Sequence, residues 1–303
     1  MLDFHKPTIA EKDAYEAILF SCPPRGCEYS FANLKLWGRQ NIAFSQGCVA
    51  LFSHFYGRSV YPYPIGNGDK KAVIENILLD AQNRGIPCRI TGMTDADRQE
   101  LEALFPDTFV LRADRDTSDY VYAIDDLADL KGRKFQKKRN HVNRFRAEHP
   151  DFRVVPLTAC NMAQAQHMIN DWYRIRMKED PEGNYMLENI ALSRACAKYE
   201  SLGMDGILLM DGDQVLAVTM GSRMGTDTFD IHFEKAREDV EGAYAAVNCE
   251  FARYLRQKYP HIAYLDREDD MGLEGLRKAK LSYNPHHLVD KYWAYRKEDL
   301  RDD

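Results

Sequence analysis

The stretch GILLMDGDQVLAVTMGSRMGTDTFDIHFEKA, residues 206–236, decides the fold of the second half of this chain. Its apolar runs are separated by Asp211-Gly212-Asp213 and by Gly225-Thr226. Aspartate and glycine supply the positive φ angles of tight hairpin turns, so the pattern predicts a three-stranded antiparallel meander. The run GAYAAVNCEFARYLRQKY (242–259) follows it and predicts a helix.

Further strands and helices are predicted on both sides of this meander. In the second half we expect strands at 152–157, 261–266 and 286–296 and helices at 162–176, 190–202 and 273–280. In the first half we expect helices at 11–20, 29–37, 69–83 and 97–104 and strands within 41–66, 86–93, 108–113 and 119–124. Neither half alternates strictly between strand and helix, which favours an α+β fold with mixed sheets. The length of 303 residues predicts two domains, 1–148 and 149–303.

The composition is that of a folded protein, with 45% hydrophobic and 11% aromatic residues. No apolar run approaches the roughly 18–20 residues that cross a bilayer, and the first residues lack the pattern of a secretory signal. We therefore expect a cytoplasmic protein. The cysteines are odd in number and never spaced as Cys-x-x-Cys, which predicts neither disulfides nor a metal site. They are Cys22, Cys27, Cys48, Cys88, Cys160, Cys196 and Cys249.

The stretch KGRKFQKKRNHVNRFR (131–146) holds eight Lys or Arg residues and no acid, although the formal net charge of the chain is -6. If residues 129–148 form a helix, Phe135, Val142 and Phe145 lie on one narrow stripe and the charges surround it. The helix would dock through that stripe. The charges would either pair with acids elsewhere in the chain or bind phosphates of a tRNA or an anionic lipid.

Three stretches resemble a known family: KKRNHVNRF (137–145), HFEKAREDVEGAYAAVNCEFARYL (232–255) and LDREDDMGLEGLRKAKLSYNP (265–285). With the order of elements, they resemble the C-terminal domain of the phosphatidylglycerol lysyltransferases, which is related to the Fem-type aminoacyl-tRNA-dependent transferases. The resemblance implies two tandem GNAT-like domains joined by the basic helix 129–148. It also implies aminoacyl-tRNA as the donor and a cleft at the domain junction. The membrane-spanning half of those lysyltransferases has no counterpart in this sequence.

The loop before the helix at 242–259 differs from the GNAT pattern. In GNAT acetyltransferases a glycine-rich loop holds the coenzyme A pyrophosphate at a helix N-terminus. Here REDVEGAY supplies Gly242 and Ala243, but Glu238, Asp239 and Glu241 stand where the pyrophosphate would lie. The acids argue against coenzyme A. They would either attract an amino group or only stabilise the helix N-terminus.

His232 and Glu234 alternate with Phe233, so they are expected on one face of a strand. They are candidate catalytic residues, with an ordinary hydrogen-bonded pair as the alternative. Tyr244 and Asn248, one helical turn apart, are candidate substrate contacts.

The third stretch places acids before a short helix and bases at its end, as the helix dipole favours. The resemblance implies that Lys280 is the lysine of the substrate cleft and therefore a catalytic candidate. Arg277, one turn earlier, is its expected companion, and Glu268 and Asp270 are candidate substrate contacts. Along the basic helix the candidate phosphate ligands are Lys134, Lys137, Lys138, Arg139 and Asn140.

Three functions follow from this sequence. The first is transfer of an aminoacyl group from aminoacyl-tRNA to a lipid, peptide or small-molecule acceptor, with tRNA and a transient anionic lipid surface as partners and no tightly bound cofactor. The second is transfer of an acyl group from acyl-coenzyme A. The third is a non-catalytic module that binds anions or RNA. No DNA partner is expected.

Overall fold

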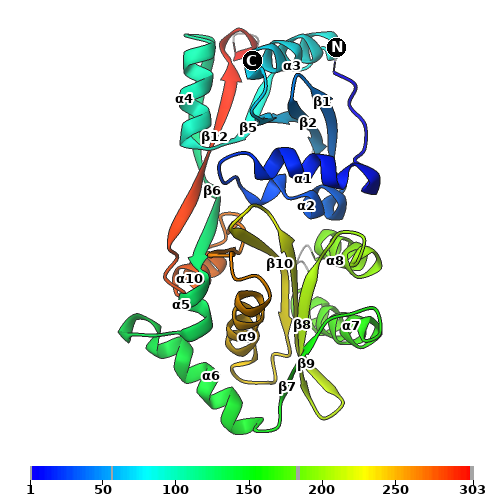
Figure 1. The fold of residues 1–303 in the computed structure, drawn as a ribbon, viewed down its shortest axis with the longest axis vertical. Coiled ribbons are helices and arrows are strands. Elements are labelled where there is room, and N and C mark those ends of the chain that lie inside the picture. The colour runs from blue at the N-terminus through cyan, green and yellow to red at the C-terminus, as the bar shows by residue number, and fades with distance from the viewer. Residues whose placement is uncertain (1, 56, 182–184, 301–303) are drawn as a thin grey trace. The chain divides into compact units, whose positions relative to one another are not determined.

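The computed structural model of the protein describes residues 2–55, 57–181 and 185–300. It contains two compact units that interleave along the chain (Figure 1). Unit 1 comprises residues 1–119, 269–273 and 288–303, and unit 2 comprises residues 120–268 and 274–287. The predicted boundary between the two domains, at residues 148 and 149, stays a prediction. A division into compact units does not test which segments fold independently.

The strands of unit 1 follow the order β1-β2-β3-β5-β12, and β4 pairs with β2. Strands β3 and β5 are parallel, whereas β1–β2, β2–β3, β2–β4 and β5–β12 are antiparallel. The bounds are β1 Gln40–Ser45, β2 Cys48–Phe55, β3 Arg58–Pro62, β4 Ile65–Gly66, β5 Arg89–Met93 and β12 His287–Arg296.

Helices cover this sheet and begin and end at local signals in the sequence. The side chains of Ser30, Asp69 and Thr94 cap the N-termini of α2, α3 and α4, and Gly38 and Gly85 end α2 and α3 with φ of 64°. Their bounds are α1 Lys12–Phe20, α2 Phe31–Trp37, α3 Lys70–Arg84 and α4 Asp95–Leu104, with 3-10 turns η1 Ile9–Glu11, η2 Cys27–Tyr29 and η4 Lys297–Leu300. The core between α3 and the sheet includes Val73, Ile74, Ile77, Tyr61 and Ile90.

Strand β6 (Phe109–Ala123) is one strand where the sequence pattern predicted two. Its charged middle has the composition of a loop, but the charges have partners. Asp114 accepts a hydrogen bond from the indole of Trp293 at 2.8 Å, and Asp119 binds Lys291 at 2.9 Å. These contacts come from the far end of the chain, so local composition could not reveal them.

In unit 2 the end of β6 begins a sheet of order β6-β11-β10-β9-β8-β7. The pair β10–β11 is parallel and its other pairs are antiparallel. The predicted meander is β8 Asp205–Asp211, β9 Gln214–Arg223 and β10 Thr228–Ala236; β7 is Arg153–Pro156 and β11 is Tyr264–Asp266. A register shift between Ile231 and Phe233 marks a bulge in β10 at His232. Such bulges re-aim side chains, often beside functional sites.

Helix α9 (Ala243–Lys258) packs on one face of this sheet, and α7 (Met162–Glu179) and α8 (Met186–Lys198) lie on the other (Figure 1). The remaining elements are α5 Ile124–Asp129, η3 Arg133–Phe135, α6 Gln136–Glu148 and α10 Glu274–Leu281. Helix α9 starts at Gly242, whose φ is 79°. A Cβ there would lie 2.4 Å from the carbonyl oxygen of His141 on α6, so only glycine permits this approach.

The α+β class with mixed sheets is confirmed. Among the helices in the described part of the chain, none has the length and apolar character that a bilayer span requires.

Candidate functional site

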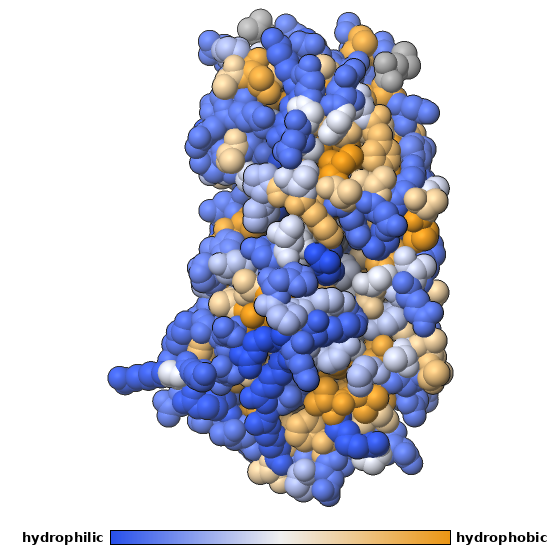
Figure 2. Space-filling model, in the orientation of Figure 1, coloured by the Kyte–Doolittle hydropathy of each residue, from blue (hydrophilic) through white to orange (hydrophobic). Residues whose placement is uncertain are grey.

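The basic stretch forms η3 and α6, which dock through the predicted stripe. Phe135, Val142 and Phe145 are buried, and the first two pack with Ala245 and Cys249 of α9. Burial of each large apolar side chain contributes roughly 1.5–3 kcal/mol, which can hold a highly charged helix in place. The surface over α6 is dominated by hydrophilic residues (Figure 2).

Half of the eight basic side chains pair with carboxylates of the same unit. The ion pairs are Lys131–Asp129, Lys134–Asp126, Arg144–Glu148, Arg144–Glu241 and Arg146–Glu250. Arg139 instead donates to the carbonyl oxygens of Leu130 and Gly132 at 2.5 and 3.1 Å. Within the described ranges no ion pair is made by Arg133, Lys137 or Lys138, and Lys137 and Asn140 are exposed. Pairing with carboxylates of the same chain therefore accounts for only part of the basic charge in residues 131–146.

Lys138 turns from α6 toward the interior of unit 2. Its Nζ lies 3.8 Å from the centre of the Tyr283 ring. Burial, together with the charge of Arg267 and against that of Glu234, lowers the pKa of Lys138 to about 8. This lysine is thus the member of the basic helix that is electrostatically coupled to the predicted catalytic strand.

Glu234 is the centre of a buried polar group under α9. Its Oε1 accepts a hydrogen bond from Nη2 of Arg267 at 3.0 Å, and its Oε2 accepts one from Nδ2 of Asn248 at 3.2 Å. The Arg267 guanidinium lies over the rings of Tyr283 and Tyr122, 4.8 and 5.6 Å from their centres. Burial lowers the pKa of Arg267, but Glu234, Tyr122 and Tyr283 together raise it above its usual value.

Lys280 fixes the backbone that carries Arg267. From α10 its Nζ donates to the carbonyl oxygens of Arg267 and Glu268 at 2.5 and 3.0 Å. The Tyr122 hydroxyl donates to the carbonyl oxygen of Lys280 at 2.8 Å. The structure therefore joins Lys280, Glu234 and Asn248 through Arg267, and their roles in a site stay a prediction.

His232 belongs to a neighbouring group. Its Nε2 lies 2.8 Å from Oγ of Ser222, and its Nδ1 lies 3.3 Å from Asp230 and 3.4 Å from Glu268. Within the described part of the chain, no hydrogen bond joins His232 to Glu234.

Among the residues that the structure describes, two clusters have the spacing of metal ligands. The ligand atoms of Asp230, His232 and Glu268 lie within 4.8 Å of one another and could hold a metal ion. In the cluster of Cys27, Glu28 and Asp119 a cation is already supplied by Lys291. That the protein needs no metal stays a prediction.

The remaining predicted site residues make other contacts. Asp270 belongs to unit 1, where it is buried and binds Arg115 at 3.3 Å. Arg277 lies on α10, one turn before Lys280. The Tyr244 hydroxyl accepts a hydrogen bond from the indole of Trp172 at 3.0 Å, which places it on the opposite, α7 side.

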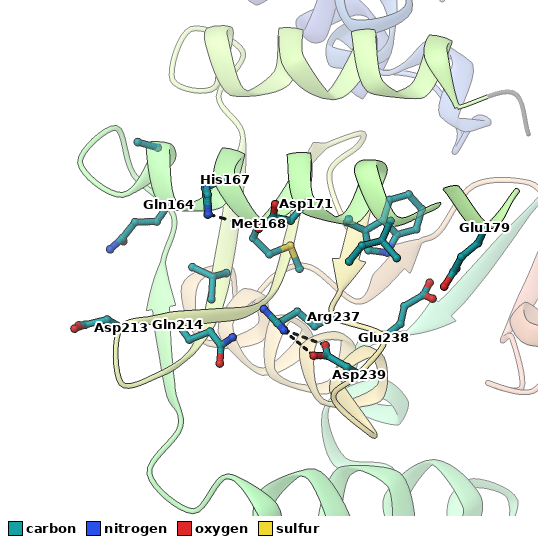
Figure 3. Close-up of a pocket in the computed structure, with 14 residues that line it drawn as sticks. Gln164, His167, Met168, Asp171, Glu179, Asp213, Gln214, Arg237, Glu238 and Asp239 are labelled. Carbon is teal, nitrogen blue, oxygen red and sulfur yellow. Dashed lines mark hydrogen bonds and ion pairs between the residues drawn. The ribbon is translucent and has the colours of Figure 1, made fainter. Parts of the chain in front are cut away.

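A cavity of about 630 Å³ lies on that side, between α7, the β8–β9 turn and the loop that follows β10 (Figure 3). Met168, Trp172 and Ile175 give it an apolar lining, and acids surround them. Arg237 points at Asp239, with two hydrogen bonds of 3.0 and 2.6 Å, so its charge is already matched. The remaining lining residues are Ala163, Gln164, His167, Asp171, Glu179, Asp213, Gln214, Val215 and Glu238.

Sequence reasoning missed Arg267, Tyr283 and Trp172. The first two lie within the third quoted stretch, but only the pairing of β11 with β10 and the return of the chain after α10 bring them to Glu234.

Solved structures share this fold over nearly the whole chain. L-PGS from Bacillus licheniformis is 15% identical, with 94% of this chain and 91% of that chain covered and a TM-score of 0.67. A conserved protein of unknown function from Bacteroides thetaiotaomicron VPI-5482 is 36% identical, with 98% and 100% covered and a TM-score of 0.93. An uncharacterised protein of Mycoplasmoides gallisepticum is 28% identical over 181 residues, or 58% of this chain. The chain spans 55% of the length of that curated relative.

Residues 20–295 match the family described as phosphatidylglycerol lysyltransferase, C-terminal. The protein belongs to this family. The predicted resemblance to this family is thereby confirmed.

Proposed function

We propose that this protein transfers an aminoacyl group from aminoacyl-tRNA to a lipid, peptide or small-molecule acceptor, at the Glu234 group of unit 2. The observation that carries the proposal is the position of Lys138. It belongs to the basic helix, which suits the tRNA backbone, and it also contacts the Tyr283 ring that lies on Arg267. One element thus links a surface for phosphates to a buried acid–base group.

The reaction needs one bond made and one broken. The acceptor's nitrogen or oxygen forms a bond to the ester carbonyl carbon, the bond from that carbon to the ribose oxygen breaks, and a proton moves from the acceptor to the ribose oxygen. Glu234 or His232 would carry that proton. Arg267 would stabilise the charge that develops on the carbonyl oxygen, and Lys280 would hold Arg267 in position.

The acyl-coenzyme A alternative is less well supported. The loop after β10 carries Glu238 and Asp239 at the rim of the cavity, and Arg237 is already bound by Asp239. A pyrophosphate there would meet like charge. For the non-catalytic alternative, the Glu234–Arg267 pair carries a desolvation cost that this function does not use, because only 12% and 16% of the two side chains are exposed.

The tRNA interaction is tested by its salt dependence. Replacing Lys137 and Lys138 by Ala should weaken binding of charged and uncharged tRNA and lower the slope of log affinity against log salt by about 1–2, as lost phosphate contacts do. The measurement is filter binding between about 50 and 200 mM salt. Lys131→Ala with Arg144→Ala is the matched control, since both side chains pair with their own carboxylates and the net charge changes equally. Equal slopes for the two double variants would contradict the proposal.

The low pKa of Lys138 predicts a pH dependence. Because that pKa is lowered from 10.5 to about 8, the charge is present below about pH 8 and lost above it. tRNA affinity of the wild type should therefore fall several-fold between about pH 7 and pH 9, whereas an ordinary lysine would stay charged. Lys138→Arg should bind equally at both values. A wild-type affinity that is flat across this window would exclude Lys138 as a phosphate ligand.

A further inference from the structure

A serine, a histidine and two carboxylates form a second polar group in unit 2, which we call the Ser222 group. Oγ of Ser222 lies 2.8 Å from Nε2 of His232. Nδ1 of His232 lies 3.3 Å from Oδ2 of Asp230 and 3.4 Å from Oε1 of Glu268. A hydroxyl, a base and an acid joined in this order are the arrangement that activates a serine for acyl transfer, on whatever fold they occur.

The Ser222 group lies on the opposite face of the sheet from Glu234. Thr219 on β9 is the register partner of Glu234 on β10, so these two side chains share a face. Because Thr219 and Ser222 are three positions apart on the same strand, their side chains point to opposite faces. The two residues after β11 divide in the same way, since Arg267 binds Glu234 whereas Glu268 binds the histidine. The two polar groups are therefore distinct.

Local irregularities of β9 and β10 bring the Ser222 group together. The bulge in β10 leaves His232 without a register partner in the described pairing with β9, and its ring reaches across to Ser222, the register partner of Asp230. Gly221 allows the two strands to approach, because a Cβ there would collide with the carbonyl oxygen of Asp230.

The two carboxylates determine which nitrogen of His232 carries the proton. Ionised carboxylates only accept hydrogen bonds, so the neutral imidazole holds its proton on Nδ1, toward Asp230 and Glu268. Nε2 is then an acceptor, and the Ser222 hydroxyl donates to it. A serine nucleophile requires this tautomer, because the base must take the hydroxyl proton as the oxygen attacks.

The surroundings of the Ser222 group restrict the charge of a substrate. Ser222, His232 and Asp230 are 3%, 8% and 0% exposed, whereas the Glu268 side chain keeps 23% of its surface exposed. A substrate would therefore approach beside Glu268. An anionic acyl group would meet like charge there, which favours neutral or cationic acyl groups.

We infer that Ser222 is the nucleophile of an ester hydrolase activity toward neutral or cationic acyl esters, with His232 as its base. Asp230 and Glu268 are positioning residues that hold the imidazole. This activity goes beyond the proposed function and needs no tRNA.

The hydrolysis proceeds in two balanced steps. Oγ of Ser222 forms a bond to the ester carbonyl carbon and its proton passes to Nε2 of His232, which returns it to the alcohol oxygen as the bond from carbon to that oxygen breaks. Water then forms a bond to the same carbon and gives a proton to Nε2, the bond to Oγ breaks, and the proton passes to Oγ. The sum is ester and water to carboxylic acid and alcohol.

The test uses the full chain in EDTA, so that a metal ion held by Asp230, His232 and Glu268 does not contribute. A fluorophosphonate, which reacts with activated serines, should form an adduct that peptide mass spectrometry places on Ser222. Release of 4-nitrophenol from 4-nitrophenyl acetate, with the uncatalysed rate subtracted, should continue after every protein molecule has reacted. No adduct, an adduct on another residue, or an adduct without turnover would overturn the inference.

Two variants make the assignment specific. Ser222→Ala should lose the adduct, and both Ser222→Ala and His232→Ala should lower kcat roughly 10²-fold or more, as loss of a proton-transfer partner does. Ser193→Ala, an exposed change on α8, is the control and should behave as the wild type does. If His232→Ala fails to fold, Ser222→Ala decides, since it removes a single oxygen atom. Unchanged turnover in Ser222→Ala would overturn the inference.

Glu268→Gln tests the preference for charge. The wild type should hydrolyse the methyl ester of mono-4-nitrophenyl adipate several-fold faster than the free acid, and Glu268→Gln should narrow this difference while lowering kcat for both. A merely structural role of Glu268 would leave the ratio unchanged. Loss of tRNA binding would defeat the proposed function and leave this activity intact, whereas an unreactive Ser222 would defeat the inference alone.

Discussion

Replacing Lys291 by Met should lower the free energy of unfolding by about 3–5 kcal/mol, the cost of breaking a buried ion pair. Lys291 is 4% exposed, and its Nζ lies 2.6 Å from Glu28 and 2.9 Å from Asp119. Asp119 is fully buried and also accepts a hydrogen bond from the backbone nitrogen of Cys27. Without the lysine, two carboxylates would stay close together with no cation between them.

Urea unfolding followed by circular dichroism near neutral pH measures this loss. Lys278→Met is the control: Lys278 is exposed and pairs with Glu274 on its own helix, so its change should stay within about 0.5 kcal/mol. Burial already raises the pKa of Glu28, although Lys291 opposes the rise. In the variant Glu28 should protonate more easily because the opposing charge of Lys291 is gone, so the deficit in the free energy of unfolding should shrink as the pH falls. A deficit below about 1 kcal/mol would mean that the cluster contributes little.

Replacing Lys280 by Met should reduce turnover roughly 10²-fold, the effect that a misplacement of about 1 Å in a catalytic group can have. Lys280 is a positioning residue here, because it bonds the carbonyl oxygens of Arg267 and Glu268 and reaches the substrate through Arg267. The loss should therefore appear in kcat more than in KM, since tRNA still binds to α6.

Turnover can be followed as loss of the aminoacyl group from charged tRNA, with hydroxylamine as a surrogate amine and the uncatalysed rate subtracted. Lys280→Arg should restore part of the activity, because a guanidinium can also donate to two carbonyl oxygens. Lys278→Ala on the same helix should leave kcat unchanged. If Lys280→Met retains full kcat with an unchanged melting temperature, the hydrogen bond from Lys280 to the carbonyl oxygen of Arg267 does not position Arg267 for catalysis.

Much of the fold follows from local patterns. The meander, α9 and the buried stripe of α6 were predictable because turn residues and helical spacing act over a few positions. The continuity of β6 was not, since the partners of its charges lie near the C-terminus. In the candidate site, Glu234 and Asn248 were predicted from the sequence. Arg267 was missed because its role depends on the parallel pairing of β10 with β11.

The interleaving of the two units has a consequence for biosynthesis. Strand β12, which pairs with β5, is translated only after all of unit 2 has been translated. Until β12 is translated, β5 therefore has no strand partner on the side where β12 will pair with it. We expect chains that end before β12 to expose this edge of β5 and to aggregate.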